Sequence, residues 1–155
     1  MRRGIITFIL VICIGGLAGA QDYRTGIGIR GGFSSGLTIK HFKSQKAAYE
    51  GLLTTRWEGF DITGLYEIHD EAFNVDHLNW YYGGGAHIGF FNGDNAYWGR
   101  NGATYTVIGL DGILGLEYTF SEIPVNIGID WKPVLNLAGY FGLWSEGGIS
   151  VRYIF

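Results

Sequence analysis

The sequence predicts an all-β fold, an eight-stranded antiparallel up-and-down transmembrane β-barrel, and three observations lead to it. Glycine accounts for 27 of the 155 residues and aromatic side chains for 16%, whereas only two prolines occur. Apolar and polar side chains alternate with a period of two along much of the chain, as in strands whose neighbouring side chains face opposite sides of a sheet. The chain is 47% hydrophobic, yet beyond residue 21 it has no run of about eighteen apolar residues that could form a spanning helix.

Residues 1–20 have the features of a secretory signal peptide. Arg2 and Arg3 precede an apolar run from Ile5 to Leu17. The small residues that end at Ala20 are typical of a signal-peptidase site, so we expect cleavage near this position. The apolar run is short for a membrane helix, and a retained anchor helix is therefore the less favoured alternative.

The mature chain, residues 21–155, has the length of one domain. Removal of two arginines moves the formal net charge from −3 to −5 (−3 − 2), and this acidic balance argues against a nucleic-acid partner. Cys13 is the single cysteine and lies in the signal segment. We therefore expect no disulfide and no cysteine-ligated metal in the mature chain, and we predict no cofactor.

Seven strands follow from the alternation. In the clearest of them, Val125, Ile127 and Ile129 share one face, while Asn126 and Asp130 share the other. An apolar face toward lipid and a polar or small face toward the interior is typical of a membrane barrel wall. The seven predicted strands are Ile27–Arg30, Leu37–Lys40, Phe60–His69, Trp80–Phe90, Ile108–Phe120, Val125–Lys132 and Ile149–Phe155.

An eighth strand is predicted between Lys46 and Trp57, because bacterial single-chain barrels have an even number of strands. As a strand, this segment would direct Tyr49 and Leu53 outward and Glu50 inward. The alternative is an amphipathic helix over residues 43–53, since Ala47, Ala48 and Glu50 have fair helix propensity.

Loop lengths predict the orientation of the barrel. With the N-terminus on the periplasmic side, the periplasmic turns are Lys43–Lys46, Glu71–Asn79 and Ser121–Pro124. The outer loops are then Gly32–Gly36, Trp57–Gly59, Asn92–Ala103 and Pro133–Glu146. Aromatic side chains fall near both predicted rims, with Trp131 near the outer one, as the amphipathic rings prefer. In the two long outer loops we expect contacts to lipid headgroups or to an unknown extracellular partner from Tyr97, Trp98, Tyr140, Phe141 and Trp144.

Many charged side chains fall on the predicted inward faces. An eight-stranded barrel encloses an interior that side chains fill, and charges buried there must be paired. We therefore predict an internal salt-bridge network that plugs the barrel, in preference to a conducting pore. Its predicted members are Arg30, Lys40, Glu50, Asp61, Glu67, Asp111, Glu117, Asp130, Lys132 and Arg152. Arg56 also falls on a predicted inward face.

The last segment, Gly148–Phe155, alternates apolar and polar side chains and ends on an aromatic residue. With this ending the mature chain resembles the small eight-stranded outer-membrane barrels of the OmpA/OmpX type. The resemblance implies an outer-membrane location in a Gram-negative-type cell and contact with membrane lipid. It also implies that the barrel-assembly machinery reads Val151, Tyr153 and Phe155. The first two outer loops are short, in contrast to the loops of barrels that have extended, adhesin-like outer loops.

Two other functions are weighed against this prediction. A lipid-modifying acyl hydrolase or transferase needs a nucleophile within reach of a base. Ser34, Ser35 and Ser145 are predicted near the outer rim, where only His87 is at a comparable height. A soluble carrier of the lipocalin type would have the opposite arrangement, with apolar side chains inside.

Two sequence patterns have simpler explanations. The match to G-x-G-x-x-G at residues 26–31 does not open a helix, as a dinucleotide site requires, and inward glycines leave room for large interior side chains. The four histidines, His41, His69, His77 and His87, have no metal-site spacing.

Overall fold

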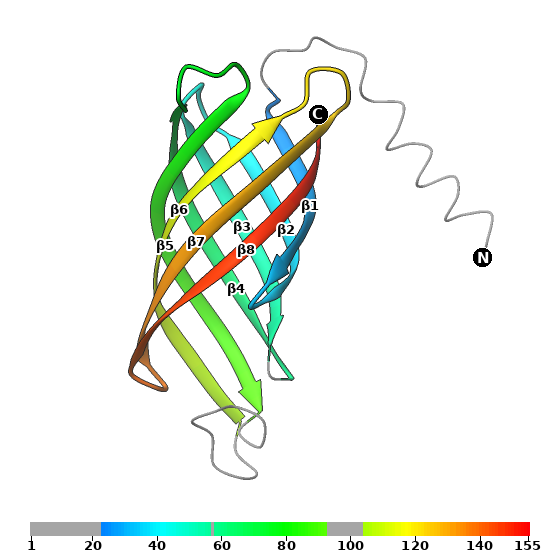
Figure 1. Ribbon diagram of the computed structural model, residues 1–155. Helices are drawn as coiled ribbons and strands as arrows, with labels where there is room; N and C mark the ends of the chain where they lie inside the picture. The colour runs from blue at the N-terminus through cyan, green and yellow to red at the C-terminus, as the bar shows by residue number, and fades with distance from the viewer. Residues whose placement is uncertain (1–22, 57, 93–103) are drawn as a thin grey trace, which may run out of the picture.

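The computed structural model describes residues 23–56, 58–92 and 104–155. In these residues, eight antiparallel strands form a closed barrel in which each strand pairs with the next and β1 pairs with β8 (Figure 1). The predicted fold class is therefore confirmed. The described residues include no helix that is long and apolar enough to cross a membrane. The strands are β1 (Thr25–Gly32), β2 (Ser35–Phe42), β3 (Ala47–Arg56), β4 (Gly59–Glu71), β5 (Leu78–Asn92), β6 (Thr104–Thr119), β7 (Val125–Ala138) and β8 (Gly142–Ile154).

The two ends of the described chain meet where the barrel closes. The backbone N–H of Thr25 donates to the carbonyl of Phe155 at 3.0 Å, and the N–H of Phe155 donates back at 2.9 Å. The start of β1, the C-terminus and the turns β2–β3, β4–β5 and β6–β7 therefore lie at one end, which we call the terminal end (Figure 1). The other end is called the mouth.

The weakest sequence prediction, the eighth strand, is confirmed. Ala47–Arg56 forms β3, which pairs with β2 and β4 along its length, so the helical alternative is wrong. The segment is a strand because Glu50, Leu52 and Thr54, at every second position, are buried on the inward face. Helix propensity is a weak preference that such tertiary burial overrides.

The predicted outer loop Pro133–Glu146 is wrong in its extent. Strand β7 continues to Ala138 and β8 begins at Gly142, because Val134 and Asn136 continue the buried inward face of β7. The ring of Pro133 has room in the wall because it lies beside Gly112, where a Cβ would be 3.0 Å from the proline Cγ. The prediction that Trp131 lies near the outer rim is therefore wrong, because this residue lies midway along β7.

Apolar side chains cover the outer wall of the barrel. Ile29, Leu37 and Ile129 are 64%, 57% and 58% exposed, whereas Lys40 and Arg152 on the inward faces are completely buried. This is the reverse of a soluble protein, in which charged side chains are almost never fully buried.

Several inward glycines make room for large interior side chains, as the sequence predicts. A Cβ on Gly115 would lie 2.5 Å from Cζ of Tyr81, and one on Gly109 would lie 2.6 Å from Cε1 of His87. Such distances are far below van der Waals contact, so Tyr81 and His87 fit in the lumen only because these wall positions have no side chain.

Candidate functional site in the barrel lumen

The structure places all ten predicted interior residues on the inward faces of the strands. Nine of them are buried, and Asp61 is half-buried beside Thr63, whose hydroxyl donates to its carboxylate at 2.8 Å. Apart from Asp61, these residues separate into two clusters, one near each end, with one ion pair between the clusters.

The cluster nearer the terminal end is centred on Lys40 of β2. Its ammonium lies 2.9 Å from Glu67, 3.1 Å from Glu117 and 3.5 Å from Glu50. These carboxylates come from β4, β6 and β3, so one cation joins four strands. We call this group, with His69 and Arg152, the Lys40 cluster.

Arg152 forms the second cationic centre of the Lys40 cluster. Its Nη2 pairs with Glu50, its Nε donates to Thr38 Oγ1 at 3.1 Å, and its Nη1 donates to Asn126 Oδ1 at 3.1 Å. His69 contacts the carboxylate of Glu67 at 3.1 Å. The bonds of Arg152 thus connect β8 to β2, β3 and β7 through the lumen.

Tyr23, which precedes β1, covers the Lys40 cluster from the terminal end. Its hydroxyl donates to Glu117 at 3.2 Å. Burial of this side chain, followed by the nearby charge of Glu117, raises the pKa of the phenol well above its usual range. Tyr23 therefore remains a neutral donor at physiological pH.

Between the clusters, Arg30 of β1 pairs with Asp130 of β7. The contact is bidentate, with the second bond from Nη2 to Oδ1 at 2.7 Å, a geometry that suits guanidinium and carboxylate. Tyr81 connects this pair to the Lys40 cluster, because its hydroxyl donates to Asp130 at 3.3 Å and its ring lies 4.0 Å from Lys40 Nζ. Sequence reasoning missed Tyr81, although its position between the outward Trp80 and Tyr82 indicates an inward side chain.

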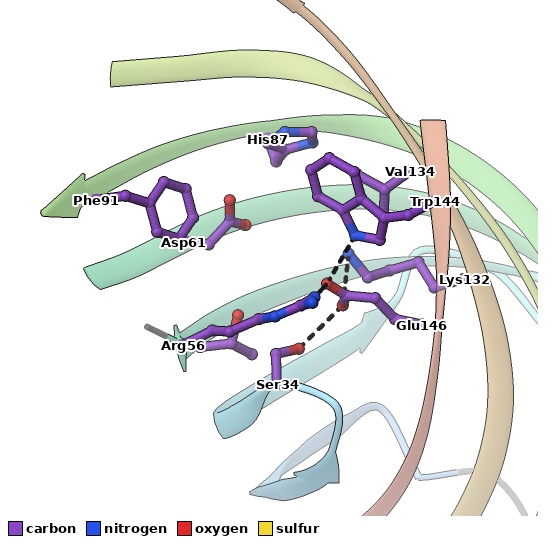
Figure 2. Close-up of a pocket in the computed structure, with 10 residues that line it drawn as sticks. Ser34, Arg56, Asp61, His87, Phe91, Lys132, Val134, Trp144 and Glu146 are labelled. Atoms are coloured by element: carbon purple, nitrogen blue, oxygen red, sulfur yellow. Dashed lines mark hydrogen bonds and ion pairs between the residues drawn. The ribbon is translucent and has the colours of Figure 1, made fainter. Parts of the chain in front are cut away.

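The cluster at the mouth is centred on Glu146 of β8, toward which Ser34, Arg56, Lys132 and Trp144 point (Figure 2). Ser34 Oγ and Arg56 Nη1 each donate at 3.0 Å, the indole of Trp144 donates at 3.3 Å, and Lys132 Nζ lies at 3.5 Å. Sequence reasoning missed Glu146 because it was assigned to a loop. The signal was available, since residues 146, 150 and 152 have the same parity and share the inward face.

Lys132 connects Glu146 to a second group at the mouth. Its ammonium donates to Asp111 at 2.9 Å, and the other oxygen of Asp111 lies 2.7 Å from His87 Nδ1. The Nε2 of His87 lies 2.8 Å from Asn136 Oδ1. We call Arg56, His87, Asp111, Lys132 and Glu146 the Glu146 cluster.

A small cavity lies among the described side chains of the lumen at the mouth. The cavity that Figure 2 shows has a volume of about 20 Å³, which is enough for about one water molecule. Its lining includes Ser34, Asp61 and Phe91. The cavity is too small for an organic cofactor, and the described residues contain no group of three or more His, Cys, Asp or Glu side chains that could hold a metal ion.

The predicted surface contacts have different outcomes. Phe141 lies in the β7–β8 turn and is 74% exposed, and Tyr140 beside it is half-buried. Trp144 is a correction, because it lies in β8 with its indole directed into the lumen. Tyr97 and Trp98, together with the loop at 93–103 and the predicted signal peptide, lie outside the described residues.

The predicted assembly-signal residues lie at the terminal end. Val151 and Phe155 are 42% and 54% exposed on the outer wall, and Tyr153 is half-buried.

Comparison with known proteins shows the fold. No family model matches the chain, and no curated protein matches it. The structure is similar to the crystal structure of the N-terminal β-barrel domain of Pseudomonas aeruginosa OprF, with a TM-score of 0.67 and 14% identity. The match covers 87% of this chain and 100% of that domain. The likeness to small eight-stranded barrels, first indicated by the terminal strand, is thereby confirmed for the fold.

Proposed function

We propose that this chain is an integral outer-membrane β-barrel with a lumen closed by ion pairs and a structural or surface-interaction role. The observation that carries the proposal is the distribution of side chains, with an apolar outer wall and a charged interior. In water, a wall of this kind would be a very large exposed apolar patch. In a bilayer it faces hydrocarbon, and the closed barrel satisfies every backbone ladder internally.

Ion pairs that cross the lumen support a closed interior. The pair between Lys40 and Glu117 joins β2 to β6, and the pair between Arg152 and Glu50 joins β8 to β3. With Arg30 and its partner between the two clusters, charged side chains obstruct the lumen at several heights. The proposed role therefore depends on the outer surface and the mouth and not on transport.

The location and orientation are part of the proposal. The signal-like residues 1–20 and the aromatic terminal strand support export and insertion into the outer membrane. The terminal end would then face the periplasm, and the mouth would face outward with Phe141.

The enzyme alternative lacks the required geometry in the described residues. His87 contacts Asp111 and Asn136, and it has no hydroxyl partner there. Thr25 Oγ1 does lie 2.9 Å from His41 Nδ1, but this exposed pair is at the terminal end and no described carboxylate orients the imidazole. A difference in lipid A mass between cells with and without the protein would support the enzyme over our proposal.

The soluble-carrier alternative requires an apolar interior. The lumen instead holds buried charges such as Lys40, Glu67 and Arg152. An apolar ligand in the lumen would be surrounded by these charged side chains.

Cell fractionation and gel migration test the proposed function. We expect the protein in the outer-membrane fraction, extractable only with detergent, and faster-migrating when unboiled. In planar bilayers we expect no sustained conductance. A soluble periplasmic protein that boiling does not affect would refute the membrane assignment, and a steady conductance would refute the closed lumen.

A further inference from the structure

An apolar groove lies on the outer wall toward the terminal end of β5, β6 and β7. Its volume is about 670 Å³. The cross-strand neighbours Trp80, Leu116 and Ile129 form one row of the wall here, and Leu114 beside Trp131 forms the next. The two tryptophans therefore stand on either side of a floor of aliphatic side chains along β6.

The β4–β5 turn extends the groove at the terminal end. Phe73 lines the groove and is 81% exposed. The backbone at Phe73, Asn74 and His77 is left-handed, with φ of 55°, 53° and 66°, a conformation that is uncommon for residues other than glycine. Hydrogen bonds from Ala72 N to Leu78 O at 2.8 Å and from Thr119 N to His77 O at 3.0 Å hold this turn against β6. The exposed phenyl ring is thus part of an ordered turn.

The walls of the groove carry unused hydrogen-bond donors. An indole N–H needs an acceptor when it faces an apolar environment. Within the described residues, the indole groups of Trp80 and Trp131 have no hydrogen-bond acceptor, and Trp131 lies midway along its strand and not at a rim. The groove therefore suits an apolar chain that also carries carbonyl oxygens.

The terminal end of the groove is acidic. Glu71 lines it, and the exposed Asp76 and Glu122 lie in the two adjacent turns. None of these three carboxylates has a salt bridge within the described part of the chain. Lys46 does not neutralise them, because its ammonium pairs with Asp70 at 2.5 Å. This charge favours a ligand with a cationic headgroup.

We propose that the groove binds a phospholipid with a primary-amine headgroup, such as phosphatidylethanolamine. One acyl chain lies along β6 between Trp80 and Trp131, an ester carbonyl accepts from an indole, and the ammonium lies beside Glu71. This inference rests on the proposed membrane location and names a specific lipid partner within it.

The test is native mass spectrometry of the full chain, purified from membranes in detergent and mixed with phosphatidylethanolamine or phosphatidylglycerol of identical acyl chains. We expect the wild type to retain phosphatidylethanolamine several-fold more strongly. Leu114→Trp fills the groove and should abolish retention. Ile62→Trp adds similar bulk at a similarly exposed position on β4 and should leave retention unchanged. Glu71→Gln should remove the preference between the two lipids.

Gel migration of each variant distinguishes failure of the proposed membrane barrel from failure of the proposed lipid site. A protein that is absent from the membrane fraction refutes the proposed function itself. If the barrel is folded but retains both lipids equally, or if Leu114→Trp retains as much lipid as Ile62→Trp, the lipid site is refuted and the barrel stands. A dimer that Leu114→Trp dissociates would likewise refute the lipid site, because it would make the groove a contact between two copies of this chain.

Discussion

Lys40 on β2 and Glu117 on β6 form an ion pair of 3.1 Å that crosses the lumen between strands on opposite sides of the barrel. Both side chains are completely or almost completely buried. An isolated buried charge is very costly, so Glu117 depends on Lys40, and Lys40 depends on Glu117 and on the neighbouring Glu67. The pair therefore ties together strands that share no backbone hydrogen bonds.

Replacement of Lys40 by Met should destabilise the barrel strongly. The change leaves three carboxylates buried around an apolar side chain, and removal of one partner of a buried pair costs about 3–5 kcal/mol. The free energy of unfolding is measured by urea titration in micelles, with the fast-migrating unboiled band as readout. Lys46→Met is the matched control, because its exposed pair with Asp70 is screened by solvent and its loss should cause no measurable change. Equal losses in the two variants would contradict the central role of Lys40.

Gly115→Ala should destabilise the barrel by about 1–3 kcal/mol, as overpacking of a filled interior does. The new Cβ would lie 2.5 Å from Tyr81 Cζ and 2.7 Å from its hydroxyl oxygen, so the ring must move away from Lys40 and Asp130. Gly64→Ala on the outer wall is the control, because no atom lies within 4 Å of its added Cβ. Unfolding titrations of the two variants check this, and a stability of Gly115→Ala equal to that of Gly64→Ala would show that Tyr81 is not confined.

Glu146→Gln should loosen the mouth and leave the terminal end intact. The amide cannot balance the charges of Arg56 and Lys132, which both approach this carboxylate. We expect faster chymotrypsin cleavage at Tyr140 or Phe141 in the β7–β8 turn. The cleavage rate is measured by mass spectrometry. Glu122→Gln in the exposed β6–β7 turn provides the comparison and should leave the cleavage rate unchanged. A wild-type rate for Glu146→Gln would argue against Glu146 as the centre of its cluster.

Phe155→Ala should impair assembly in cells but not refolding of the purified chain in detergent. The bonds that close the barrel at this residue are backbone bonds to Thr25, which alanine retains, whereas the proposed assembly signal depends on the aromatic ring. The matched variant is Phe120→Ala, another exposed aromatic residue at the terminal end. Outer-membrane yield and refolding yield are measured for both. If outer-membrane yield falls equally in the two variants, the terminal phenylalanine has no special role in recognition.

Much of the candidate site could be predicted because the inward or outward direction of a side chain is a local property. In a strand, parity alone assigns a residue to one face, so Arg30, Lys40 and Arg152 could be placed in the interior without a structure. The same rule, applied further along β8, would have included Glu146. It was missed because Pro133–Glu146 was assigned to an outer loop, whereas the buried side chains of Val134 and Asn136 continue the strand.

The sequence by itself determined where most strands lie, which of their faces is apolar and the charged character of the inward faces, because each follows from alternation within short segments. The tertiary structure decided the partners. Lys40 and Glu117 are 77 residues apart, and their contact depends on strand register and barrel closure, which the alternation leaves open. The groove on β5, β6 and β7 likewise depends on three strands and a distant turn. Partners that come from separate strands exist only once the barrel has closed.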